Sequence, residues 1–159
     1  MAGSTVTGLR KPSNRVTIEV GAEYFNVGSN ATAAKMKPGV GVEADGAGCV
    51  KEFDGTGIVI GILGYEDSQP GDYKPATRDT AYAAGVRVPV IPPTATYGKA
   101  VRCRLAASQT IVRGQILMWT TDGLLTAATA GTHDVAATAA EDISTGAGDA
   151  GTAIWVFLR

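Results

Sequence analysis

"AAEDISTGAGD", residues 139–149, resembles an earlier stretch of the chain, "GYEDSQPGD", residues 64–72. Each stretch places Glu-Asp after an apolar run and then enters a polar loop that contains glycine. Either the chain uses an acidic pair twice for catalysis, or it builds one structural unit twice. The surrounding sequence favours the second interpretation.

Turn signals around these two stretches recur in the same order at a nearly constant separation. The corresponding pairs are Pro38-Gly39 with Arg113-Gly114 (114 − 39 = 75), Asp45-Gly46 with Asp122-Gly123 (122 − 45 = 77), and Glu66-Asp67 with Glu141-Asp142 (141 − 66 = 75). A period this long predicts two similar halves rather than a solenoid. We expect halves at about residues 16–91 and 97–159 within one β domain, residues 16–159. Chance similarity between two turn-rich segments is the alternative.

The composition predicts an all-β protein. Of the 159 residues, 45% are apolar, 18% are charged and 21 are glycine. This profile suits short strands joined by tight turns, and no segment shows the period of a long amphipathic helix. The chain is long enough to bury a substantial core.

The charge and hydropathy patterns exclude two classes of partner. The formal net charge of −1 gives no general attraction to nucleic acid or to anionic membranes. No apolar run approaches the roughly 18 residues of a membrane-spanning helix. The first residues, "MAGSTVTGLRKPSNRV", lack the apolar region of a secretory signal. We therefore expect neither nucleic acid nor membrane as a partner.

The residues that usually carry catalysis or bind metals are scarce. His133 is the only histidine, and Cys49 and Cys103 are the only cysteines, far apart in sequence. A zinc site needs several such ligands, and a catalytic triad needs a histidine with defined neighbours. We expect no catalytic residue, no metal and no cofactor. Both cysteines are expected to be reduced, with a disulfide between the halves as the alternative.

The acidic pairs do not suit catalysis either. Adjacent residues on a strand point to opposite faces, so Glu66 cannot easily act with Asp67, nor Glu141 with Asp142. A pair across the halves, such as Glu66 with Glu141, is geometrically allowed. Bonding of these acids to nearby loop N–H groups is favoured, because Asp commonly does this in turns. The sequence therefore predicts that the protein is not an enzyme.

One lysine-bearing segment resembles a different class of β protein. "AAKMKPG", residues 33–39, is similar to the hairpin tip that carries the modified lysine in biotin and lipoyl carriers. The biotin signature is Met-Lys-Met, whereas the order here is Lys35-Met36-Lys37. A carrier function is therefore a minor alternative.

Basic residues supply the first candidate contacts with a partner. Residues 1–15 are polar, without periodicity, and carry Arg10, Lys11 and Arg15. Such a segment has too few apolar side chains to fold alone. We expect an extended N-terminal arm that becomes ordered only when a partner surface holds it.

A second pair of cations lies on a predicted strand, "VRCR". Strand alternation places Arg102 and Arg104 on one face, with Val101 and Cys103 on the other. Such a pair usually forms a solvated face, and it also suits contact with an acidic partner.

The segment "TAIWVFLR" predicts a strand with two apolar faces. Ile154, Val156 and Leu158 should share one face, and Trp155 and Phe157 should share the other. Both faces should therefore be covered, one of them by a neighbouring subunit.

Four stretches together resemble the head-decoration, or capsid cement, proteins of tailed bacteriophages and related viruses. They are "DGTGIVIGILGYEDSQPGD", "AAGVRVPVI", "VRCRLAASQTIVRGQILMWTTDGLL" and "TAIWVFLR". The resemblance implies a compact β-barrel or tulip-like fold that forms oligomers, often trimers, on the outside of a capsid. It brings no catalytic motif.

The resemblance implies a viral structural protein that binds the outer surface of a capsid and stabilises it. Its partners would be the major capsid protein and its own copies, as a homotrimer in the virion, after synthesis in the host cytoplasm. Candidate capsid or subunit contacts are Arg10, Lys11, Arg15, Arg102 and Arg104. The alternative function is a small duplicated β-barrel module, ligand-binding or carrier, associated with an enzyme.

Overall fold

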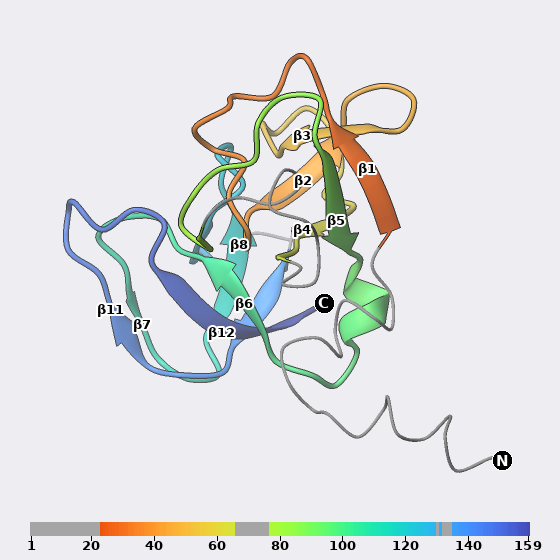
Figure 1. Cartoon of the computed structure of the whole chain (residues 1–159). Helices are drawn as coiled ribbons and strands as arrows, with labels where there is room; N and C mark the ends of the chain where they lie inside the picture. Colours follow the sequence, from red (N-terminus) through yellow and green to blue (C-terminus); the bar gives the residue numbers. More distant parts are fainter. Residues whose placement is uncertain (1–22, 66–76, 130, 132–134) are drawn as a thin grey trace, which may run out of the picture.

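The computed structural model describes residues 23–65, 77–129, 131 and 135–159, and these form an all-β protein (Figure 1). The predicted fold class is confirmed, and the first half of the chain forms a closed β-barrel. The predicted arm, residues 1–15, lies outside the described residues, as do Glu66, Asp67 and His133. Among the described residues, no helix has the length and hydropathy needed to span a membrane.

Five strands form the barrel of the first half, in the order β1-β3-β2-β4-β5. They are β1 (Glu23–Val27), β2 (Gly41–Ala44), β3 (Cys49–Glu52), β4 (Gly61–Leu63) and β5 (Arg87–Ile91). Antiparallel pairing of β1 with β5 closes the barrel, and β1 runs parallel to β3. The predicted Asp45-Gly46 turn joins β2 to β3, with Gly46 at φ +84°.

The second half forms a five-stranded sheet, in the order β6-β12-β10-β8-β9, and a small two-stranded sheet of β7 and β11. The strands are β6 (Val101–Arg104), β7 (Thr110–Ile111), β8 (Ile116–Trp119), β9 (Leu125–Ala127), β10 (Ala137–Ala139), β11 (Ile143–Ser144) and β12 (Ala153–Leu158). A parallel bridge between Leu105 and Leu125 joins the two edges of the larger sheet. A short 3₁₀ helix, η2 (Pro93–Thr96), connects the halves.

The two halves share one strand order. When β1, β2, β3, β4 and β5 are matched with β6, β8, β9, β10 and β12, each strand has the same neighbours in both halves. The parallel contact also corresponds, because β1 meets β3 in one half and Leu105 meets Leu125 in the other. Strands β2 and β8 begin 116 − 41 = 75 residues apart, close to the spacing of the turn signals. Duplication with boundaries at residues 16–91 and 97–159 stays a prediction.

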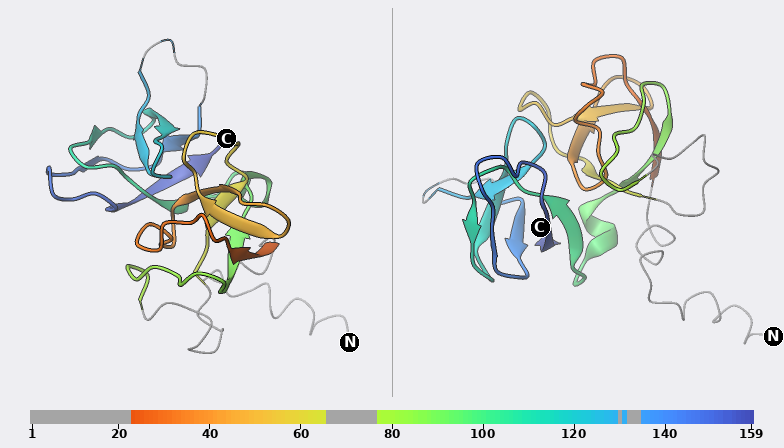
Figure 2. Two further views of the ribbon diagram at one scale, coloured as in Figure 1. Left: turned by 90° about the horizontal axis from the view of Figure 1, so that it is seen from above. Right: turned by 60° about the vertical axis from the view of Figure 1, so that its left-hand side comes forward.

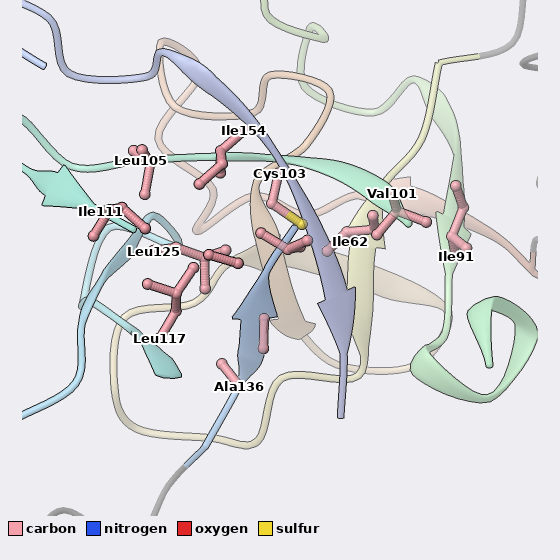
Figure 3. Close-up of a cluster of buried hydrophobic side chains, with 13 residues drawn as sticks. Ile62, Ile91, Val101, Cys103, Leu105, Ile111, Leu117, Leu125, Ala136 and Ile154 are labelled. Carbon is pink, nitrogen blue, oxygen red and sulfur yellow. The ribbon is translucent and has the colours of Figure 1, made fainter. Parts of the chain in front are cut away.

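The halves lie side by side and share a core (Figure 2). One apolar cluster fills the first barrel and includes Met36, Val42, Val50 and Tyr82. The other cluster contains residues of the second sheet together with Ile62 and Ile91 of the first half (Figure 3). Apolar burial therefore holds the two halves together, since strands of both contribute to one cluster.

Backbone contacts at the junction depend on glycine. The Gly41 N–H donates to the Gly123 carbonyl at 2.8 Å, so the backbone segments that contain these two glycines lie against each other. Gly123 has φ +66°, and a Cβ there would lie 2.4 Å from the Gly41 oxygen. A Cβ on Gly41 would lie 2.9 Å from the Trp119 ring. Both positions exclude a side chain at this distance of approach.

Cys49 and Cys103 are both free thiols, as expected, and they lie in very different surroundings. Cys103 is fully buried in β6, and burial raises the pKa of its thiol. Cys49 is half-buried at the start of β3.

Dithionitrobenzoate is therefore expected to modify Cys49 in the folded protein at about pH 8 and to leave Cys103 unmodified until the chain unfolds, because the thiolate is the reactive species. The absorbance of the released product should rise in two phases: one thiol per chain should react fast, and the second should react only at the rate at which the chain unfolds. Cys49→Ser should abolish the fast phase alone. Equal rates for the two thiols in the folded state would contradict the buried position of Cys103.

Candidate docking surface

Strand β12 buries one face and exposes the other. Ile154 and Val156 are completely buried, whereas Trp155 and Phe157 are 42% and 40% exposed. The predicted division of residues between the faces is confirmed for these four. The core of the chain covers one side of this sheet only, and coverage of the other side by a neighbouring subunit stays a prediction.

The strands beside β12 extend this exposed face. Arg102 pairs with Trp155, and Thr138 pairs with both Phe157 and Ile116, so all five side chains project from the same side of the sheet. Ile116 is also exposed, at 43%. We call this surface the outer face; it consists of Arg102, Ile116, Thr138, Trp155 and Phe157.

Two arginines contact other side chains of the outer face. The Arg102 guanidinium lies over the Trp155 ring, 5.4 Å from its centroid. Arg159 Nε donates to Thr138 Oγ1 at 2.9 Å. A cation over an aromatic ring is attracted by the ring electrons, and such a contact restricts both side chains. The outer face therefore combines exposed apolar side chains with two neighbouring guanidinium groups.

Arg104 does not belong to this surface, contrary to the sequence-based expectation of a solvated pair. Its guanidinium donates to the carbonyl oxygens of Pro38 (2.6 Å), Gly151 (2.7 Å) and Arg78, and it bonds Asp79 Oδ1 at 3.1 Å. Arg104 is only 6% exposed. The Arg104 N–H also donates to the Gly39 carbonyl, so the end of β6 lies against the Pro38-Gly39 segment of the first half. Arg102 thus remains a candidate contact, and Arg104 is an internal structural residue.

A cleft of about 400 Å³ opens between the halves, next to the outer face. Ile62 and Ile91 from the first half and Val101 from the second supply its apolar lining. Trp155 and Arg102 belong both to this cleft and to the outer face. The cleft and the face are therefore one continuous surface.

The second acidic pair is bonded to the backbone. Glu141 Oε1 accepts from the Trp155 N–H at 2.9 Å, and Asp142 Oδ1 accepts from the Arg113 N–H at 2.6 Å. This arrangement matches the structural role that the sequence favoured. The first pair, Glu66 and Asp67, lies outside the described residues.

The sequence did not predict a buried acid in the first barrel. Glu43 is almost completely buried, and its carboxylate accepts from the Gly57 N–H at 3.0 Å and from Thr56 Oγ1 at 3.1 Å. Lys51 Nζ lies 3.2 Å from Glu43 and 2.5 Å from Asp54. Hydrogen bonding to Lys51 and Thr56 holds the pKa of Asp54 far below its usual range. These bonds attach the loop after β3 to the barrel, which is a structural role.

The segment "AAKMKPG" is not a hairpin tip. It connects β1 to β2, and these two strands are not neighbours in the barrel. Met36 is fully buried, and Lys35 Nζ forms an ion pair with Asp122 at 2.6 Å. The hydrogen bond to Asp122 raises the pKa of Lys35. The similarity to a carrier hairpin therefore does not extend to the structure.

The described residues contain no group of three or more His, Cys, Asp or Glu side chains arranged to hold a metal ion. Of the candidate contacts, Arg10, Lys11 and Arg15 lie outside the described residues. The outer face gave one sequence signal, the alternation in β12. Ile116 and Thr138 gave none, because only strand pairing brings them beside Phe157.

No family model matches the chain, and no curated protein matches it. Among solved structures, the head fiber gp8.5 N base of bacteriophage phi29 is similar, with a TM-score of 0.42 and 13% sequence identity. The match covers 87% of this chain and 92% of that chain.

Proposed function

We propose that this protein is a capsid decoration, or cement, protein that binds the outer surface of a viral shell and stabilises it. Its proposed partners are the major capsid protein and its own copies, as a homotrimer, and its proposed location is the virion. The resemblance of four sequence stretches to such proteins supports this function. The observation that carries it is the exposed Trp155 and Phe157 on a rigid sheet.

The outer face has the composition of a binding surface. Aromatic residues and arginine supply most of the binding energy in protein interfaces, particularly near the centre of the contact. Trp155 and Phe157 project from β12, whose other face is packed into the core. Because the backbone beneath them is already ordered, little conformational entropy is lost when a partner covers them.

Binding to a shell also agrees with the chemistry of the described side chains. Glu141, Asp142 and Glu43 are each bonded to backbone N–H groups, which is a structural use of acids. We propose on this basis that the protein is not an enzyme. We also propose that Arg10, Lys11 and Arg15 contact acidic groups of the shell or of a neighbouring copy.

Truncation of the outer face should weaken attachment while the protein remains folded. Trp155→Ala is expected to lower affinity for capsids at least about 30-fold, because central aromatic residues contribute about 2 kcal/mol or more. The free energy of unfolding should fall by only about 1–2 kcal/mol, since the side chain is partly exposed. Bound copies per capsid across a concentration series measure the first effect, and urea unfolding measures the second.

Tyr97→Ala is the matched control, because Tyr97 is an aromatic residue that is 92% exposed and follows η2. It should change neither capsid affinity nor stability. Mass spectrometry of purified virions should detect the protein beside the major capsid protein. Its absence from virions, or equal capsid occupancy by wild type and Trp155→Ala, would overturn the proposed function.

A further inference from the structure

The cleft between the halves has a guanidinium on each wall. On the first half, Arg78 lies over the Tyr65 ring at 5.7 Å from its centroid. On the second half, Arg102 lies over the Trp155 ring at 5.4 Å. All four residues line the same cleft. Two arginine–aromatic pairs, from segments far apart in sequence, therefore face one space.

The described lining residues of the cleft carry a net positive charge. Arg104 also lines the cleft, with its side chain only 7% exposed. Asp79 is the one acid among the described lining residues, and its side chain is 85% exposed. Three arginines and one aspartate give 3 − 1 = +2, whereas the whole chain carries −1. A concave, partly apolar surface concentrates such a field and attracts anions.

The lining of the cleft selects among anions. The partly exposed rings of Tyr65 and Trp155 provide apolar surface beside the arginines. A nucleic acid or a sulfated polysaccharide carries a charge on most of its repeating units and has no aliphatic side chain for such a surface. A peptide with both carboxylates and aliphatic side chains meets both requirements. Arginine binds carboxylates through two parallel hydrogen bonds, which adds geometric selectivity.

We propose that this cleft binds an acidic peptide segment of the shell protein. Carboxylates of the segment pair with Arg78 and Arg102, and an aliphatic side chain between them contacts the Tyr65 and Trp155 rings. This assignment rests on the proposed function, because it takes the shell protein as the source of the segment. The neighbouring cleft, of about 440 Å³, has Arg159 as the one charged residue among its described lining, and it lacks this pair of cationic walls.

The full-length protein can be tested with short capped peptides. The probe is a fluorescently labelled peptide of alternating Glu and Val, compared with peptides in which Gln replaces Glu or Ser replaces Val. Fluorescence anisotropy should show binding of the first peptide and at least about tenfold weaker binding of the other two, because one charge-assisted hydrogen bond contributes about 1.5–3 kcal/mol. Added salt should weaken the binding.

Variants test the two walls. Arg78→Gln and Arg102→Gln should each reduce affinity for the Glu-Val peptide about tenfold, whereas Arg113→Gln, which removes one charge from an exposed turn, should leave it unchanged. Circular dichroism checks that each variant is folded, and Arg102→Gln tests the cleft alone if Arg78→Gln unfolds. Equal binding of the Gln-Val peptide, or equal effects of all three variants, would overturn the proposal. Tighter, Arg78-dependent binding of heparin or of an oligonucleotide would overturn it too, in favour of a polyanion.

Measuring binding to whole capsids as well distinguishes failure of this inference from failure of the proposed function on which it rests. If the Glu-Val peptide binds but capsids do not, the proposed function fails and the peptide-binding cleft stands without its shell partner. If Trp155→Ala detaches the protein from capsids while Arg78→Gln and Arg102→Gln do not, the function stands and the cleft assignment is wrong. We expect all three variants to reduce capsid occupancy.

Discussion

Arg104→Met is expected to lower the free energy of unfolding by about 3–5 kcal/mol, because the guanidinium makes several hydrogen bonds at the junction and each hydrogen bond to a charged group contributes about 1.5–3 kcal/mol. Methionine fills part of the space but donates no hydrogen bond. The carbonyl oxygens of Pro38, Gly151 and Arg78 would then lose their side-chain donor at the junction. Pro38 is buried, and a buried acceptor left without a partner costs about 1–3 kcal/mol. Urea unfolding monitored by circular dichroism measures the loss.

Arg102→Met is the matched control, two residues away on the same strand. Arg102 is exposed and contacts the Trp155 ring, so its replacement should cost no more than about 1 kcal/mol. Arg104→Lys should lower the free energy of unfolding by nearly as much as Arg104→Met, because an ammonium group cannot reach several acceptors in the way a planar guanidinium does. If Arg102→Met and Arg104→Met were equally destabilising, the role assigned to Arg104 would be wrong.

Gly123→Ala is expected to cost about 3 kcal/mol or more. A left-handed backbone conformation costs a non-glycine residue about 1–2 kcal/mol, and overpacking adds about 1–3 kcal/mol. The new Cβ would lie 2.4 Å from the Gly41 oxygen and 2.6 Å from Val40 Cγ1, so the strands at the junction must separate. This separation lengthens the bond from the Gly41 N–H to the Gly123 carbonyl. Thermal and urea unfolding measure the effect.

Gly114 provides a control, because it also has a positive φ but has open space where a Cβ would lie. Its φ is +86°, and a Cβ there would meet no atom within 4 Å. Gly114→Ala should therefore cost only the conformational part, about 1–2 kcal/mol. The difference between the two variants isolates the close approach at the junction. Identical losses would mean that Gly123 is required for its conformation alone.

Local patterns predicted the local features of this fold. The Asp45-Gly46 and Asp122-Gly123 pairs lie in turns with positive φ at each glycine, as such dipeptides do for steric reasons. Alternation in β12 correctly placed Ile154 inside and Trp155 outside, because the period of a strand depends only on its backbone.

Features that depend on segments far apart in sequence were not predictable from such patterns. Arg104 is buried because Pro38, 66 residues away, accepts its hydrogen bond, and strand alternation contains no information on that contact. Glu43 is buried because the loop containing Thr56 and Gly57 folds over its carboxylate. The cleft likewise combines Tyr65 and Arg78 with Arg102 and Trp155, so it exists only after the halves have packed together.

The closure of the first barrel, and the bridge between the edges of the larger second sheet, have a consequence for how this protein can change during evolution. Exposed strand edges pair readily with other chains, and a closed barrel has none. The first half is closed by β1 and β5, and the Leu105–Leu125 bridge joins the edges of the second sheet. The proposed attachment depends on the side chains of Trp155, Phe157 and Arg102, and replacing them leaves the hydrogen bonds between strands in place. Single substitutions on the outer face can therefore change which partner the protein binds, while the strand pairing that determines its fold stays the same.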